Sequence, residues 1–201
     1  MKRALIVIDV QNEYFTGALP ITHPPREESL AAVLTAMDTA REHGIPVVVV
    51  QHTSPAGSPL FAAGGHSWEL HEEVGRRPYD HLVEKTMASA FAGTDLAGWL
   101  DAQGVDTLTV AGYMSQNCDE STARDAHHRG LAVEFLSDAT GTLALSNRAG
   151  SVTAEELHDH VLVVMDSNFA SVATVAEWAG AVGSGAPLPR PNIWASTRGH
   201  A

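Results

Sequence analysis

Three side chains with different chemistry stand where predicted strands end. Asp9 closes an apolar run near the N-terminus, Lys85 closes a weaker run, and Cys118 follows a third run by five residues. Catalytic and ligand-binding groups in open parallel sheets gather at the carboxyl ends of the strands. We therefore expect a carboxylate, an ammonium group and a thiol to meet at one edge of a sheet. These are the groups of a base, a cation and a nucleophile.

Cys118 is the only cysteine of the chain. A free cysteine is more often a buried small hydrophobe, and that alternative stays open. Its neighbours here are polar, however, since Ser115, Gln116 and Asn117 open a predicted helix just before it. Unpaired N–H groups and the dipole at a helix start favour a thiolate. The sequence therefore predicts an activated Cys118 that alkylates quickly near neutral pH.

Asp9 and Lys85 each have a simpler interpretation when taken alone. An acid at a strand end can be a strand terminator or a helix cap, and a lysine is usually solvated. Residues 86–91 after Lys85 are uncharged, however, which is unusual for a surface turn. This favours a Lys85 side chain that points into a pocket.

Alternating segments place these residues in an α/β fold. Continuous apolar runs, typical of parallel strands covered on both faces, occupy 3–10, 46–52, 81–85, 107–113, 131–137 and 160–166. Helical patterns occupy 27–43, 94–103, 115–129, 154–158 and 172–178, and the first three end at a glycine. The alternation predicts a three-layer αβα fold with a parallel sheet. The long loop 54–75 is expected to be a functional cover or disordered.

Composition limits the class of protein. A chain of 201 residues supports one sizeable core, assigned to residues 1–182, with an extended tail over 183–201. The formal net charge of −12 argues against nucleic-acid and anionic-membrane partners, and no apolar run is long enough to span a membrane. One cysteine fits a reducing compartment, so we expect a cytoplasmic protein without disulfides.

Three ordered motifs resemble those of the isochorismatase-like cysteine hydrolases. They run through most of the chain, from about residue 2 to 182. The motifs are residues 5–11 (LIVIDVQ) with Phe15 and Gly17; Glu84-Lys85 with residues 89–91 (SAF) and 94–96 (TDL); and residues 110–114 (VAGYM) leading to Cys118, Thr122, Ala123, Ala126 and Gly130.

The resemblance implies a six-stranded sheet in the order 3-2-1-4-5-6 and a homodimer or homotetramer. It implies a catalytic triad in which Asp9 is the base, Lys85 the cation and Cys118 the nucleophile. It also implies a cis peptide bond at Tyr113–Met114, with the amides of Met114 and Cys118 forming an oxyanion hole.

Two positions depart from the family pattern. Position 119 is Asp where relatives commonly carry Val. Facing the site, Asp119 would raise the pKa of the thiol, whereas facing outward it would favour the helix N-terminus. Zinc-dependent nicotinamidases carry an acid two residues before a histidine after the second strand, but here the place reads Gln51-His52-Thr53. We therefore expect no metal and no other cofactor, and His158 is interpreted as solvated.

The sequence predicts a cysteine-dependent hydrolase of an amide-like C–N bond in a small molecule. The alternatives are a vinyl-ether hydrolase of the isochorismatase type, a nicotinamidase, and a catalytically silent binding or redox-sensing module. Aromatic and polar side chains near the strand ends are the candidates for the substrate pocket: Tyr14, Phe15, His52, Phe61, Trp68 and Tyr113.

Overall fold

The apolar runs form a six-stranded parallel sheet in the order β3-β2-β1-β4-β5-β8. The computed structural model describes residues 1–190 and 192–198. The order confirms the predicted topology, because β8 is the sixth strand of this sheet. In chain order its strands are β1 (Arg3–Ile8), β2 (Val47–His52), β3 (His81–Lys85), β4 (Thr107–Tyr113), β5 (Ala132–Gly141) and β8 (Ser171–Ala173). A separate hairpin pairs β6 (Leu145–Asn147) with β7 (Gly150–Val152).

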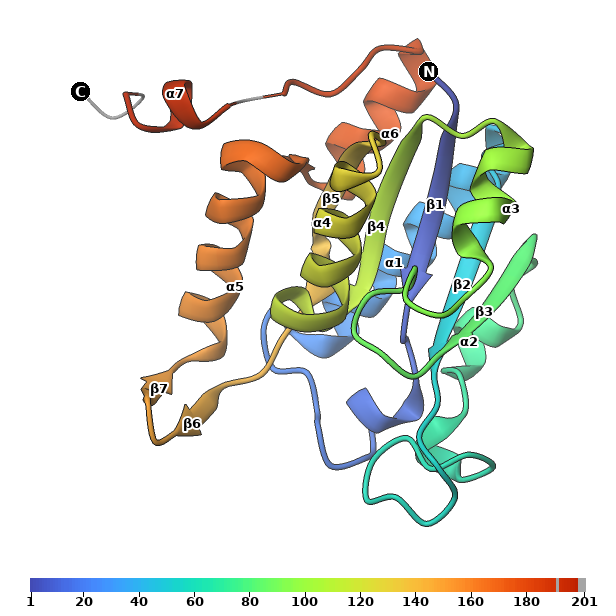
Figure 1. Ribbon diagram of the computed structural model, residues 1–201, viewed down its shortest axis with the longest axis vertical. Helices are drawn as coiled ribbons and strands as arrows, with labels where there is room; N and C mark the ends of the chain where they lie inside the picture. The colour runs from blue at the N-terminus through green and yellow to red at the C-terminus, as the bar shows by residue number, and fades with distance from the viewer. Residues whose placement is uncertain (191, 199–201) are drawn as a thin grey trace.

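Helices cover both faces of the sheet, which gives the predicted three layers (Figure 1). The helices α3, α4 and α5 pack on one face, and α1 and α6 pack on the other. None of the helices among the described residues has the length and apolar character needed to cross a membrane. The helices are α1 (Arg26–Glu42), α2 (Glu72–Gly75), α3 (Leu96–Gln103), α4 (Glu120–His128), α5 (Ala154–Val164), α6 (Val175–Ser184) and α7 (Ile193–Ser196).

The sixth strand lies later in the chain than predicted. Residues 160–166, expected as a strand, belong to α5 and to the π-helical turn Met165–Phe169. A capping box between Thr153 and Glu156 starts this helix, and the apolar run that follows continues it. The strand is the three-residue β8, where a helix was predicted to begin, and a second capping box at Thr174 starts α6.

The ends of β1 and β4 approach each other closely at Gly112. Its φ is +123°, and a Cβ atom there would lie 2.0 Å from the carbonyl oxygen of Ile8. Only glycine accepts both this conformation and this contact. The approach places Asp9, directly after β1, beside the chain that leaves β4 toward Cys118.

The C-terminal segment is partly helical rather than extended. The helix α6 continues to Ser184, two residues beyond the predicted domain end, and Leu188 packs against the core. Farther on, α7 projects from the body, with Ile193 and Trp194 exposed (Figure 1). Residues 191 and 199–201 of the predicted tail lie outside the described residues.

We propose that α7 lies on a second copy of the chain in a homodimer or homotetramer, because it is too short to bury its apolar side chains alone. Replacing Trp194 with glutamate is expected to weaken association. Light scattering at micromolar concentration measures this directly, and a monomeric wild-type protein would contradict the proposal.

Candidate active site

The strand ends bring Asp9, Lys85 and Cys118 together. The Nζ atom of Lys85 lies 2.7 Å from Oδ2 of Asp9 and 3.2 Å from Sγ of Cys118. All three residues are buried, with exposed fractions of 0% for Asp9, 2% for Lys85 and 4% for Cys118. The predicted base, cation and nucleophile therefore form one contact cluster, with Lys85 in the middle.

His52 contacts Lys85 from the neighbouring strand, and Gln11 fixes the backbone of His52. His52 ends β2, and its Nδ1 atom lies 3.2 Å from Nζ of Lys85. Burial, and then the charge of Lys85, lower the pKa of His52, so the imidazole is neutral and Nδ1 accepts from the ammonium group. Gln11 fixes His52 through both backbone groups, donating to its carbonyl at 3.0 Å and accepting from its amide at 2.8 Å.

The charges of the cluster favour an ammonium group beside a protonated thiol. Burial alone would lower the pKa of Lys85, but the negative charge of Asp9 opposes burial and the pKa is raised. Burial raises the pKa of the Cys118 thiol and Asp9 raises it further, while Lys85 lowers it by less. The resting site therefore contains a charged lysine and an uncharged cysteine.

The surroundings of Cys118 do not favour the thiolate that the sequence predicted for the resting site, and the predicted fast alkylation near neutral pH stays untested. The helix start and Lys85 do favour a thiolate, but burial of Cys118 outweighs them. We expect the rate of alkylation by iodoacetamide to keep rising at pH values above the pKa of an ordinary thiol. Rate measurements against pH test this, and a curve that levels off at or below the pKa of free cysteine would contradict it.

The peptide bond Tyr113–Met114 is cis, as the family resemblance implied. The Met114 amide donates no hydrogen bond to any residue that the structure describes. The Met114 carbonyl accepts hydrogen bonds from the amides of Asn117, at 2.9 Å, and Asp119, at 3.3 Å. These two residues flank Cys118 in the π-helical turn Ser115–Asp119. The Met114 amide is thus free to bind an oxyanion, and the oxyanion hole itself stays a prediction.

Asp119 faces the cluster rather than solvent. Its exposed fraction is 0%, and neither carboxyl oxygen has a hydrogen-bond partner among the residues described. Were it ionised, its charge would raise the pKa of the Cys118 thiol and of the Tyr14 phenol. Of the two orientations that the sequence left open, the structure therefore has the inward one.

Tyr14, Phe61 and His52 form a wall beside the cluster. The ring of Phe61 packs edge-on against Tyr14, with centroids 5.4 Å apart, and against His52 at 5.1 Å. Burial, followed by the charge of Asp9, raises the pKa of the Tyr14 phenol, so this hydroxyl is uncharged. These three predicted pocket residues lie together beside the cluster, and their contact with a substrate stays a prediction.

Tyr113 and Phe15, also predicted for the pocket, lie farther back. The Tyr113 hydroxyl is 2.8 Å from Oγ of Ser29 on α1, so its polar end points toward that helix. Its ring packs between Tyr14 and Phe15, with centroid distances of 5.5 and 6.0 Å. Tyr113 is fully buried and supports the wall.

The loop 54–75 is tied to the strand ends through Trp68. The Trp68 carbonyl accepts from Nε2 of Gln11 at 2.6 Å and from Nε2 of Gln51 at 2.8 Å. The indole Nε1 donates to Oγ1 of Thr53 at 2.9 Å. The loop is therefore an ordered wall of the site, and Gln11 and Gln51 are the residues that fix it.

Gln51 takes the place of the acid that zinc-dependent nicotinamidases carry. Its side-chain amide donates a hydrogen bond to the Trp68 carbonyl. Within residues 1–190 and 192–198, no group of three or more His, Cys, Asp and Glu side chains is arranged to hold a metal ion. We expect catalytic activity to survive a chelator. Elemental analysis that found about one zinc per chain, lost together with activity, would overturn this expectation.

His158 is buried rather than solvated as predicted. Its Nδ1 atom lies 2.8 Å from Oγ of Ser115, and its Nε2 atom lies 2.9 Å from the carbonyl of Ser137. Ser115 opens the turn that carries Cys118. The α5 helix thus fixes the nucleophile segment, a role that the sequence did not reveal because 154–158 was predicted only as a short helix.

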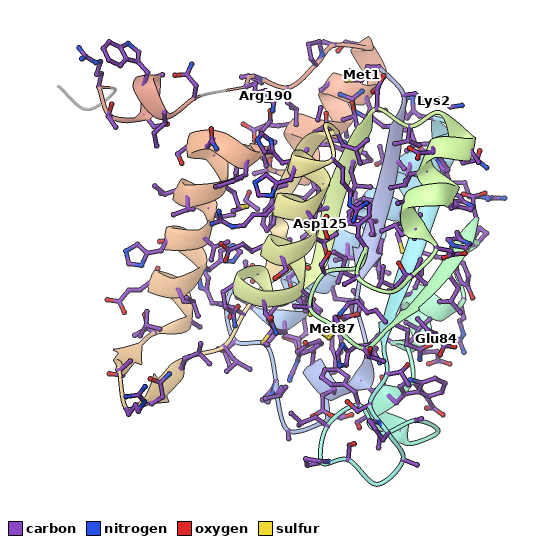
Figure 2. The ribbon with its side chains drawn as sticks, viewed as in Figure 1. Met1, Lys2, Glu84, Met87, Asp125 and Arg190 are labelled. Atoms are coloured by element: carbon purple, nitrogen blue, oxygen red, sulfur yellow. The ribbon has the colours of Figure 1, made fainter. Side chains whose placement is uncertain are left out.

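A cavity of about 680 Å³ lies elsewhere, between β8, α6 and the C-terminal segment. Arg190, one of its lining residues, lies near the top of the view in Figure 2, well above Met87 on the loop after β3. No member of the triad lines this cavity. The buried cluster at the strand ends, rather than this cavity, carries the reactive groups.

A family model and a solved structure that match this chain belong to the same protein family. The model of the isochorismatase domain matches residues 3–177. The crystal structure of an isochorismatase-type protein from Burkholderia xenovorans LB400 is 58% identical, with a TM-score of 0.97 over 98% of this chain and 95% of that one.

Two curated proteins are similar over most of the chain. YddQ of Bacillus subtilis (strain 168), an uncharacterized isochorismatase family protein, is 34% identical over 176 residues, covering 87% of this chain and 97% of YddQ. The ureidoacrylate amidohydrolase RutB of Methylobacterium radiotolerans is 31% identical over 212 residues, covering 89% of this chain and 79% of RutB. On its sequence, its sheet and these matches, the chain belongs to the isochorismatase family of hydrolases.

Proposed function

We propose that this protein hydrolyses an amide-like C–N bond of a small molecule, an amide, lactam, carbamate or urea, through a thioester on Cys118. The observation that carries the proposal is the position of Lys85, which contacts both Asp9 and Cys118 inside a buried site. A carboxylate and a thiol joined by one ammonium group can exchange a proton without solvent. The similarity to an amidohydrolase supports this bond type.

In the proposed first half-reaction, Asp9 takes the proton of the Cys118 thiol as Sγ attacks the substrate carbonyl carbon. Lys85 stabilises the negative charge that leaves Asp9 and passes to sulfur. The amides of Met114 and Cys118 bind the oxyanion. When the C–N bond breaks, the protonated Asp9 gives its proton to the leaving nitrogen and a thioester remains.

In the second half-reaction, Asp9 takes a proton from water, and the hydroxide attacks the thioester carbonyl. The C–S bond breaks, the acid product leaves, and the proton returns from Asp9 to the sulfur. The raised pKa of Cys118 suits this cycle, because sulfur is a thiol between turnovers and a thiolate only when Asp9 removes the proton.

The alternatives differ in what they require of Cys118. A vinyl-ether hydrolase uses the acid and needs no nucleophile. A silent binding or redox-sensing module needs no turnover. Neither explains why Lys85 joins the thiol to a carboxylate in a buried cluster.

The test is a panel of primary amides, lactams, N-carbamoyl compounds and isochorismate. Release of ammonia or amine is measured, and acid-quenched protein is analysed by mass spectrometry for an acyl group on the peptide that contains Cys118. We expect C–N cleavage with a transient adduct. Turnover of isochorismate without an adduct would favour the vinyl-ether reaction, and binding without turnover of any compound would favour the silent module.

A further inference from the structure

Asp119 is a buried carboxyl group that the proposed mechanism does not use. It is fully buried, and neither of its oxygens is paired with any residue that the structure describes. The titratable groups that interact electrostatically with it come from several elements: Asp9 after β1, Lys85 on β3, Cys118 in its own turn, and the phenols of Tyr14 and Tyr113. The carboxyl group is therefore buried in the same region as the nucleophile, one residue along the same turn.

The surroundings of Asp119 favour its uncharged form. A buried carboxylate needs hydrogen bonds or a cation, and Asp9 adds a like charge beside it. Lys85 is the nearby cation, but its ammonium group has three N–H donors. Asp9, Cys118 and His52 already lie within 3.2 Å of Nζ and match those three donors. In agreement, burial first, and then Asp9, raise the pKa of Asp119 well above the usual range.

We propose that Asp119 is held as a neutral carboxylic acid and is a substrate-binding residue that pairs with a carboxamide or ureido edge next to the reacting carbon. An uncharged carboxyl group offers one O–H donor and one carbonyl acceptor on the same edge. A primary amide or a ureido group offers the complementary acceptor and N–H donor, so two hydrogen bonds form. An ester has no N–H to complete the pair, and a carboxylate ligand would add a second negative charge beside Asp9.

Pairs of alkylating reagents test this recognition without any known substrate. Iodoacetamide carries a primary amide one carbon from the atom that Cys118 attacks, whereas 2-iodo-N,N-dimethylacetamide lacks the N–H donors. The ratio of their rates, divided by the ratio for free cysteine, measures the preference for the amide edge and cancels differences in thiol reactivity. It is measured for the wild type, Asp119→Asn and Asp119→Leu.

We expect a preference of about tenfold in the wild type, as two net hydrogen bonds give. Asp119→Asn retains the preference, because its amide is neutral and also offers one donor edge and one acceptor. Asp119→Leu, which has the same branched shape without polar atoms, brings the ratio close to that of free cysteine. Equal ratios in all three proteins would show that only the size of the reagent matters and would overturn the proposal.

The charge of Asp119 is tested separately from its contacts. If Asp119 is neutral, the apparent pKa of Cys118 from alkylation rates is the same in the wild type and in Asp119→Asn. A lower apparent pKa in Asp119→Asn would show that a negative charge had been removed, which contradicts a neutral Asp119. This second measurement also decides the matter if Asp119→Leu does not fold.

The inference deepens the proposed function but does not depend on turnover, because alkylation needs only the thiol and the space beside it. A protein that shows the preference and hydrolyses nothing would reject the proposed hydrolysis and keep the role of Asp119 in recognition. A protein that hydrolyses amides and shows no preference would keep the proposed hydrolysis and reject the role of Asp119 in recognition.

Discussion

Replacing Cys118 with alanine is expected to lower kcat for any amide substrate by about a thousandfold or more. The reason is that the covalent route disappears, and only binding and the oxyanion hole remain to assist water. The fold should persist, since the side chain is small and its loss from the core costs about 1 kcal/mol of unfolding free energy. Steady-state kinetics and urea denaturation measure the two effects on the same protein.

Cys118→Ser is the matched variant. It keeps the size of the side chain and its contact with Lys85, but a hydroxyl is a much poorer nucleophile than a thiolate with Asp9 as the base. We expect a loss of activity close to that of Cys118→Ala, with no acyl adduct on residue 118. Wild-type rates in Cys118→Ala would sink the thioester mechanism and leave general acid chemistry by Asp9.

Replacing Asp9 with asparagine is expected to destabilise the protein by about 3–5 kcal/mol. Asp9 and Lys85 are a fully buried ion pair with a 2.7 Å separation, so the single variant leaves an ammonium group without its counter-charge. Activity should fall together with stability, because the proposed base is gone. Denaturation by urea near neutral pH gives the change in unfolding free energy.

The double variant Asp9→Asn, Lys85→Met separates the charge from the packing. It removes both charges while keeping both shapes, so we expect most of the lost stability to return although activity stays lost. A double variant less stable than Asp9→Asn alone would mean that Lys85 stabilises the core through its stem rather than through the ion pair.

The strands that carry the site could be predicted because both faces of the sheet are covered, so that their sequences are continuous apolar runs. The strands 81–85 and 107–113 match β3 and β4 at both ends, and Asp9 and Lys85 follow from the rule for parallel strand ends. The run 160–166 failed because an apolar β-branched segment suits a strand and a buried helix equally. The capping box at Thr153 makes this run helical, and it lies seven residues before the run begins.

The site's electrostatics could not be predicted in the same way. The direction in which Asp119 points depends on the π-helical turn that carries it, which no residue pattern announced. The raised pKa of Cys118 depends on burial in three dimensions. His158 was misjudged for the same reason, since its two polar contacts come from residues 43 and 21 positions away.

The seal around the triad has a kinetic consequence. Asp9, Lys85 and Cys118 have almost no exposed surface, and hydrogen bonds through Trp68 fasten the neighbouring wall to the strand ends. We therefore expect a substrate to enter only when this wall opens, which makes entry slower than diffusional encounter. The same closure governs how the acyl group is partitioned between competing acceptors. In the proposed mechanism, we expect water enclosed with the thioester to receive the acyl group, while amines in bulk solution are kept out until the wall opens again.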